Sequence, residues 1–190
     1  MLDSFCHNFA EAVYILAEKI DMTNILHSIP GLEPGLHRMA CEDKVDGIFF
    51  AGRLTRELAN RYNTTVAFIS LNGDGEDYQK LVESYGVKRF YSVRQNNPDI
   101  NVILRKCSAM HSRRFVRCII IDEFPNLIIK GFPGDREEEK MEIRNRLDSL
   151  AKALDIPIFL LYPKSEMTDL PDNEIDVLDA DIIGQLAAEK

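Results

Sequence analysis

Two carboxylates follow the most apolar segment of the sequence. The run FVRCIIIDEF occupies residues 115–124, and it contains Asp122 and Glu123 directly after its apolar part. Adjacent carboxylates supply the hard oxygen ligands that Mg²⁺ takes, which makes the pair a candidate metal or cofactor site. The simpler interpretation is that both side chains form the polar end of a buried strand and face solvent. We favour this simpler interpretation.

Lys44 is a second candidate, as the single cation in the polar stretch CEDKVDG (residues 41–47). A loop that precedes a helix presents unpaired backbone amides, which bind anions. Three carboxylates in the same stretch would repel an anion. We therefore keep Lys44, Asp122 and Glu123 as vestigial cofactor contacts and predict no bound cofactor.

Histidines and cysteines form two pairs with a spacing of four residues. His37 precedes Cys41, and Cys107 precedes His111. A zinc site needs more ligands that converge on one point, so we expect no metal at either pair. A nucleophilic role for Cys41 or Cys107 lacks the Cys-His-Asn set that such chemistry uses. The sequence thus predicts no catalytic residue of this kind.

Charge is distributed unevenly along the chain, whose net charge is −8. Residues 88–117 hold eight basic residues and one acidic residue, whereas residues 164–190 hold eight acidic and two basic residues. Both segments are consistent with ordinary solvated faces. The residues of the basic segment that we name as candidate contacts for nucleic acid or a partner are Arg94, Arg105, Lys106, Arg113, Arg114 and Arg117.

Two kinds of binding could use these charges. The basic segment could contact the phosphates of a nucleic acid, or the basic and acidic faces of neighbouring copies could meet head to tail. The negative net charge disfavours nucleic acid, and we find no platform of interleaved aromatic and basic residues beyond Phe90 and Tyr91. We therefore expect self-association or a protein partner before nucleic acid.

The elements that must position these residues alternate between strands and helices. The spacing of apolar residues predicts helices over 4–20, from Phe50 to Leu58, around 78–85 and over 135–154. Apolar runs predict strands at 36–40, 64–71, 115–124 and 156–162, with further candidates at 101–104 and 180–187. Strands that are apolar throughout are typical of a parallel sheet with helices on both faces, so we expect a three-layer α/β fold.

Length and composition limit the class of protein. The chain has 190 residues, of which 45% are hydrophobic and 28% charged, which excludes a disordered or fibrous chain. We expect one domain over 1–190, with an N-terminal helix and connector over 1–28 and a core over 29–187. Four scattered cysteines, an N-terminus unlike a signal peptide and the lack of a long apolar run predict a cytoplasmic protein without a membrane partner.

The order of several motifs resembles the RecA-like ATPase core of the DnaB-type replicative helicases. In order, the pieces are GLEPGLHRMA, a polar loop, a helix, VAFISL, CIIIDE, LAKALDIPIFLL and NEIDVLDADII, and they extend over about residues 29–187. The resemblance implies a RecA-like fold of the P-loop NTPase type. It also implies a setting in DNA replication, DNA repair or a mobile element.

The sequence departs from this family where the family performs its chemistry. A nucleotide loop needs GxxxxGK[ST], and the resemblance puts Val45, Asp46 and Gly47 where Gly-Lys-Thr would stand. Asn72 replaces the catalytic glutamate, and Tyr162 with the following proline replaces a Ser-Gln pair. The acidic pair at the end of CIIIDE is the one element retained.

The resemblance therefore implies a non-catalytic RecA-like domain that acts as a structural or regulatory binding protein. Two alternatives remain open. One is a nucleotide-binding ATPase with an atypical phosphate loop, and the other is a nucleic-acid-binding module that acts through residues 88–117.

Overall fold

A computed structural model describes residues 32–41, 44–71, 75–122 and 124–163. The strands are β1 (Gly35–Cys41), β2 (Thr65–Ser70), β3 (Phe90–Arg94), β4 (Val116–Asp122) and β5 (Pro157–Pro163). The helices are α3 (Lys44–Tyr62), α4 (Gly75–Ser84), α5 (Ile100–Arg114) and α6 (Arg136–Leu154), with a short 3₁₀ turn η1 (Phe124–Asn126). The helix expected over 4–20 and the strand expected over 180–187 lie outside the described residues.

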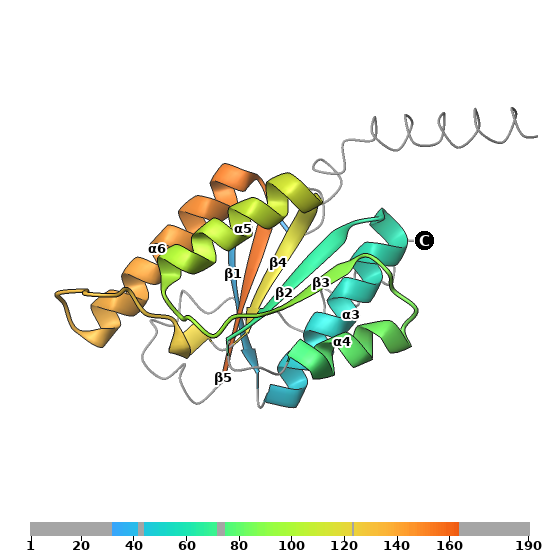
Figure 1. The fold of residues 1–190 in the computed structure, drawn as a ribbon, viewed down its shortest axis with the longest axis horizontal. Helices are drawn as coiled ribbons and strands as arrows, with labels where there is room; N and C mark the ends of the chain where they lie inside the picture. Colours follow the sequence, from blue (N-terminus) through green and yellow to red (C-terminus); the bar gives the residue numbers. More distant parts are fainter. Residues whose placement is uncertain (1–31, 42–43, 72–74, 123, 164–190) are drawn as a thin grey trace, which may run out of the picture.

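The five strands form one parallel sheet in the order β1-β5-β4-β2-β3 (Figure 1). Because all strands run the same way, their carboxyl ends lie at one edge of the sheet, which we call the carboxyl edge. Their amino ends lie at the opposite edge, the amino edge. The central strands are buried along almost their whole length, as apolar runs covered on both faces should be.

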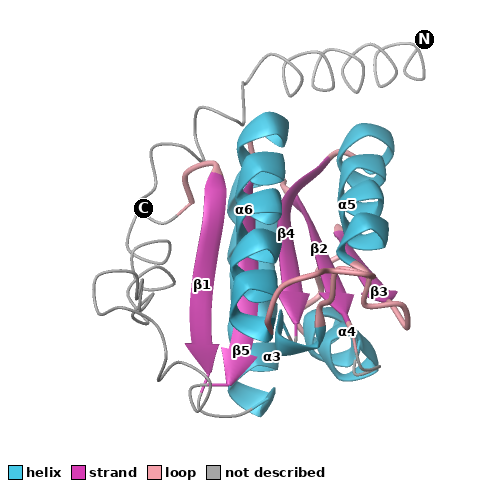
Figure 2. Cartoon of the chain, turned by 90° about the vertical axis from the view of Figure 1, so that its left-hand side faces the viewer, coloured by secondary structure: helices cyan, strands magenta, loops and turns pink. Residues whose placement is uncertain are grey.

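Two helices cover each face of the sheet, which gives three layers (Figure 2). Alternate residues of β4 enter different cores: Ile119 and Ile121 pack towards α5 and α6, whereas Cys118 and Ile120 pack towards α3 and α4. This alternation is the period of two of a strand. The predicted three-layer α/β architecture is confirmed.

Helix α6 follows the sequence prediction closely. Ile143, Leu147 and Ala151 are buried at helical spacing. Asp135 caps the helix by accepting hydrogen bonds from the backbone N–H groups of the first turn, and the Glu138 side chain accepts from the Asp135 N–H. This reciprocal arrangement is a capping box, which fixes where the helix begins.

Three predictions about elements need correction. The strand expected at 101–104 lies within α5, because Asp99 caps a helix whose apolar residues recur at helical spacing. Strand β3 was not predicted, since it is the half-buried edge strand and lacks a continuous apolar run. The polar loop expected over 41–47 is much shorter, because α3 begins at Lys44.

Candidate functional site

The carboxyl edge brings together the positions that the sequence analysis singled out. Ala40 in β1 lies beside Tyr162 in β5, and Ser70 in β2 lies beside Asp122 in β4. Parallel pairing places the ends of these strands at one edge although they are distant in sequence. In open α/β sheets this edge is where ligands bind.

Asp122 is held at this edge in a buried position, with 6% of its surface exposed. Two of its predicted companions, Glu123 and Asn72, lie outside the described residues. Lys44 is the first residue of α3, and only its backbone is described. Within the described parts of the chain, no three His, Cys, Asp or Glu side chains converge in a way that could hold a metal ion.

The connection from β1 to α3 leaves little room for a phosphate-binding loop. Under the resemblance to the helicase core, the loop would correspond to residues 41–47. The first of these positions belongs to β1, and α3 begins at Lys44. Only Glu42 and Asp43 remain between the strand and the helix.

Gly47 lies in the first turn of α3 and faces β1 and β5. A Cβ atom at this position would lie 3.4 Å from Cys41 Sγ and 3.4 Å from Leu161 Cδ1. These are ordinary contact distances, so the packing here does not require a glycine.

Tyr162 is the last residue but one of β5, and the resemblance matches it to the Ser-Gln pair of the helicases. Burial raises the pKa of its hydroxyl, and the positive charges of Arg38 and Arg144 oppose that rise. The side chain is therefore a neutral, buried phenol packed in the core that α5 and α6 cover.

His37 and Cys107, one residue from each histidine–cysteine pair, are buried and packed against other parts of the fold. His37 stacks on Phe159 with ring centroids 5.1 Å apart, and its Nε2 lies 2.8 Å from the carbonyl oxygen of Glu33. Burial raises the pKa of Cys107 to about 12, which keeps its thiol protonated and unreactive.

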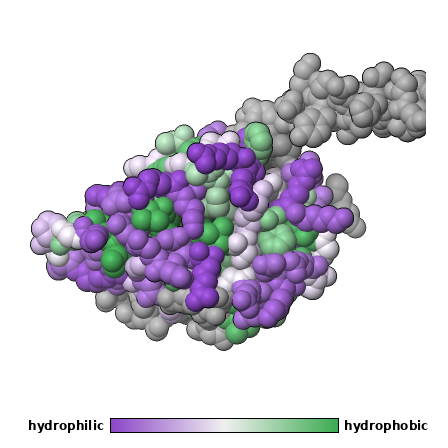
Figure 3. Space-filling model, in the orientation of Figure 1, coloured by the Kyte–Doolittle hydropathy of each residue, from purple (hydrophilic) through white to green (hydrophobic). Residues whose placement is uncertain are grey.

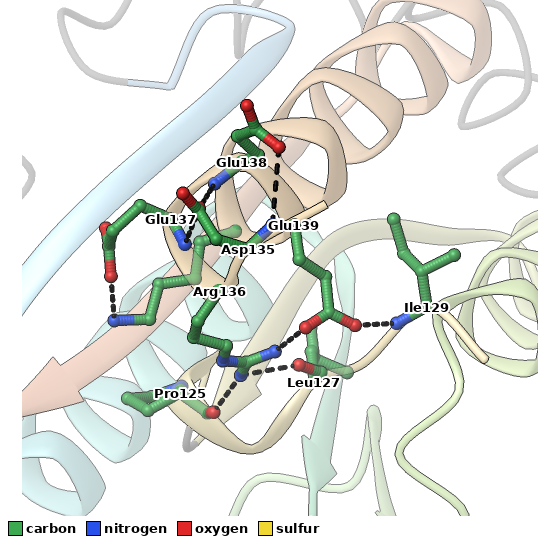
Figure 4. Close-up of polar contacts among 9 residues, drawn as sticks. Pro125, Leu127, Ile129, Asp135, Arg136, Glu137, Glu138 and Glu139 are labelled. Carbon is green, nitrogen blue, oxygen red and sulfur yellow. Dashed lines mark hydrogen bonds and ion pairs between the residues drawn. The ribbon is translucent and has the colours of Figure 1, made fainter. Parts of the chain in front are cut away.

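The segment that follows Asp122 is fixed to α6 by a cluster of polar contacts (Figure 4). Glu139 accepts a hydrogen bond of 2.5 Å from the backbone N–H of Ile129 and pairs with Arg136. The Arg136 guanidinium also donates to the carbonyl oxygens of Pro125 and Leu127. We call residues 124–130 the strap.

A second set of contacts holds the strap to the start of α5. Ile128 donates its N–H to the carbonyl of Pro98 at 3.1 Å and accepts from the N–H of Ile100 at 2.9 Å. The chain after the acidic strand end is thus held from two sides, by α6 and by α5.

Comparison with known proteins gives a structural neighbour. No known family profile matches the sequence, and no curated protein matches it. Among solved structures, the chain is similar to a KaiC-like protein from the hyperthermophilic archaeon Pyrococcus horikoshii, with a TM-score of 0.50 and 17% sequence identity. The match covers 69% of this chain and 62% of that chain, so this chain spans less than two thirds of the archaeal protein.

The fold is RecA-like. At 17% identity the similarity carries the fold and no chemistry. The expected fold class is therefore confirmed, while the narrower resemblance to the DnaB-type helicases stays a prediction. No helix in the described ranges is long and apolar enough to cross a membrane.

The RecA-like fold divides the basic segment between the two edges of the sheet. Arg94 ends β3, and Lys106 donates a hydrogen bond of 2.5 Å to Gln95, so both lie towards the carboxyl edge. Arg105 is exposed on α5. The remaining candidates gather at the amino edge, where α5 ends and β4 begins: Arg113, Arg114 and Arg117.

One residue beside this second group was not predicted as a candidate from the sequence. Phe115 lies between the arginines in the run RRFVR and has 70% of its surface exposed. The sequence itself shows arginines on both sides of this phenylalanine. What the sequence did not reveal is that a helix ends there and turns the ring outwards.

Proposed function

We propose that this chain is a RecA-like domain without ATPase activity that acts as a structural or regulatory binding protein. The observation that carries the proposal is the connection between β1 and α3. Two residues, both acidic, join the strand to the helix where a nucleotide loop would need several glycines, a lysine and a hydroxyl.

Electrostatics support the same conclusion. Glu42, Asp43 and Asp46 put three carboxyl groups in and after this connection. A polyphosphate placed there would meet like charges, and each close pair costs about 4 kcal/mol at 4 Å with an effective dielectric constant near 20. A single nearby lysine does not offset several such pairs.

The cellular setting that we propose rests on the resemblance to the DnaB-type helicases, and it is DNA replication, DNA repair or a mobile element. In this setting the domain contributes a surface rather than a reaction. The alternative is an ATPase with an atypical phosphate loop, in which Asp122 and Glu123 would hold Mg²⁺ and position water.

Isothermal titration calorimetry with Mg²⁺–ATP and Mg²⁺–ADP at high protein concentration tests the proposal. We expect no binding tighter than about 1 mM, which corresponds to about −4 kcal/mol. Tighter binding that is lost in Asp122→Asn would contradict the proposal and favour the ATPase alternative. Binding that this variant retains would also contradict the proposal, and it would locate the nucleotide elsewhere.

A further inference from the structure

The junction between α5 and β4 holds a phenylalanine in an unusual backbone conformation. Phe115 has φ 53° and ψ 34°, and its N–H donates to the carbonyl of Met110, which caps α5. A left-handed residue at a helix end is most often glycine, because a side chain there meets steric resistance. This ring is also more exposed than the other exposed large apolar side chains of the described residues.

Arginines flank Phe115 in the sequence. Arg113 and Arg114 are exposed in the last turn of α5. The Arg114 guanidinium lies 4.7 Å from the centroid of the Tyr91 ring in β3, which holds it in a cation–π contact. The helix end therefore presents fixed positive charge beside an exposed aromatic face.

A bulge at the start of β4 adds a third arginine. Thr65 pairs with Val116, whereas the next residue of β2, Val66, pairs with Cys118, so β4 contains one extra residue, Arg117. Bulges of this kind redirect a side chain. Arg117 Nη1 lies 3.2 Å from His111 Nδ1, which places this arginine beside the end of α5 with the other two.

Basic residues predominate in this region, and Asp155 is an acidic residue close enough to act on His111. Burial lowers the pKa of His111, and the nearby Arg117 lowers it further, while the hydrogen bond with the Val116 carbonyl and the charge of Asp155 act in the opposite direction. The imidazole is neutral at pH 7 as a result. Lys88 and Arg89 are exposed just before β3 and continue the positive charge along the amino edge.

A structural role alone does not account for this arrangement. Basic residues in the last turn stabilise a helix through its dipole, which explains Arg113 and Arg114 in part. It does not explain an exposed phenylalanine in a conformation that glycine or asparagine adopts at less cost.

We propose that the amino-edge cluster, consisting of Arg113, Arg114, Phe115 and Arg117, binds single-stranded nucleic acid. Phe115 stacks on a base, and the three arginines contact phosphates, which is how proteins hold single strands without reading sequence. The inference rests on the proposed role as a binding protein and names its partner.

The surroundings of Phe115 favour a nucleic acid over a protein. A protein interface has a core of several apolar side chains. The other exposed large apolar side chains of the described residues lie on other elements: Val45, Phe49, Ile128 and Met141. On the face drawn in Figure 3, hydrophilic side chains predominate and apolar ones form separate small spots. A single exposed ring among arginines suits base stacking.

The net charge of −8 does not oppose this partner. Eight of the acidic residues belong to residues 164–190. Charges act over about 8 Å at physiological salt, so a local cluster of arginines governs the field near its own surface. The earlier preference for a protein partner rested on the charge of the whole chain and on the lack of interleaved aromatic and basic residues beyond Phe90 and Tyr91.

Fluorescence anisotropy with the full chain tests the proposal. The probes are labelled oligothymidylate and oligouridylate of about 16 nucleotides, the upper end of the usual site size. We expect binding at low salt, with a slope of log K against log salt of about −2, which is −0.7 for each of three phosphate contacts. Phe115→Ala should weaken binding about tenfold or more, Phe115→Tyr should retain it, and Arg113→Ala/Arg114→Ala should bring the slope closer to zero by about 1.4.

Phe115→Gly separates a binding role from a structural one. Glycine accepts the left-handed conformation, so this variant should be at least as stable to thermal unfolding as the wild type but should lose affinity. Phe49→Ala removes an exposed ring from α3, and Lys80→Ala removes an exposed charge from α4. Both control variants should bind as the wild type does.

Three results would overturn the inference. They are no binding of either oligonucleotide at the lowest salt, binding that the cluster variants leave unchanged, and self-association of the wild type that Phe115→Ala abolishes while oligonucleotide affinity is unaltered. Because nucleotide binding is measured in a separate titration, failure here leaves the proposal of a non-catalytic domain standing. Tight binding of ATP would refute the proposal of a non-catalytic domain and would leave the proposal of nucleic-acid binding unaffected.

Discussion

Single side chains decide how the chain is held at the carboxyl edge. Glu139 is the clearest case, because its carboxylate joins α6 to the strap through the N–H of Ile129 and through Arg136. The hydrogen bond from Ile129 lowers the pKa of Glu139 below its usual value of 4.5, and Arg136 lowers it further, although burial acts in the opposite direction. The charged form is therefore the one that stabilises the strap.

Glu139→Gln should lower the free energy of unfolding by about 1.5 kcal/mol at pH 7, because the hydrogen bond and the ion pair both lose a charged partner. A lowered pKa contributes stability that is complete above pH 4.5 and disappears as the pH falls through the folded-state pKa. The difference between wild type and variant in urea unfolding should thus shrink below about pH 4.5.

The matched control for this substitution is Glu137→Gln in the same turn of α6. Glu137 pairs with Lys140 at the surface, with 56% of its side chain exposed, and its loss should cost less than about 0.5 kcal/mol. Equal losses for the two variants would mean that the strap contacts contribute nothing of their own.

At the scale of elements, a buried contact between side chains fixes helix α3 against helix α4. Helices α3 and α4 meet at a hydrogen bond of 2.7 Å between Thr55 Oγ1 and the Tyr78 hydroxyl, and both residues are fully buried. Tyr78 also stacks on Phe68 of β2, with ring centroids 4.2 Å apart. Removing either hydroxyl leaves the other buried without this partner.

A double-mutant cycle tests this contact. Tyr78→Phe and Thr55→Val should each lower the free energy of unfolding by about 1–3 kcal/mol, the cost of one orphaned buried polar group. The double variant should lose less than the sum of the two, by about 1 kcal/mol or more. Tyr85→Phe, which alters a half-buried tyrosine beside the same core, serves as the control. Strictly additive losses at Thr55 and Tyr78 would contradict the coupling.

The sequence correctly predicted the helices and strands whose apolar pattern follows from burial. It did not predict the elements that depend on a helix cap or on a position at the edge of the sheet. Strands β2, β4 and β5 are mostly apolar and buried along most of their length, and the apolar stripe of α6 is regular, so all four were predictable. Helix α5 was partly mistaken for a strand because its β-branched start, INVI, has strand propensity, whereas the Asp99 cap and tertiary packing favour the helix.

The candidate sites also include some features that the sequence pointed to and others that it did not. The resemblance singled out Asp122 and Tyr162 separately, and the parallel pairing of β4 with β5 brings the ends of their strands to one edge. The exposure of Phe115 depends on the left-handed turn after α5 and on the bulge at Arg117. Neither feature has a signature in the residue types, because glycine is the usual residue in such a turn.

The whole molecule has a RecA-like fold. Under the proposed resemblance to the DnaB-type helicases, the nucleotide loop, the catalytic glutamate and the Ser-Gln pair correspond to the stretch 41–47, to Asn72 and to Tyr162 with Pro163. These positions lie on different segments of the chain. A single change cannot restore them together.

Asp46→Lys, which returns a lysine to the position where the helicase loop has one, should therefore produce no ATP hydrolysis in a sensitive phosphate-release assay. Hydrolysis above the buffer rate that disappears in Asp46→Lys/Asp122→Asn would show that one substitution suffices, and would contradict the account of multiple losses. ATP hydrolysis that survives in Asp46→Lys/Asp122→Asn does not depend on Asp122, so the double variant serves as the control.

The pairing of β1 with β5 has a consequence for synthesis. Gly35 pairs with Pro157, so the first strand of the described sheet gains this neighbour only after more than a hundred further residues have been made. At ribosomal speeds of 5–20 residues per second, this delay is on the order of ten seconds. During that time the nascent chain carries LHRMAC as an unpaired strand, open to association with other chains. Translation that stalls before β5 leaves the emerging polypeptide in this state, and chaperones that shield extended segments would act on it then.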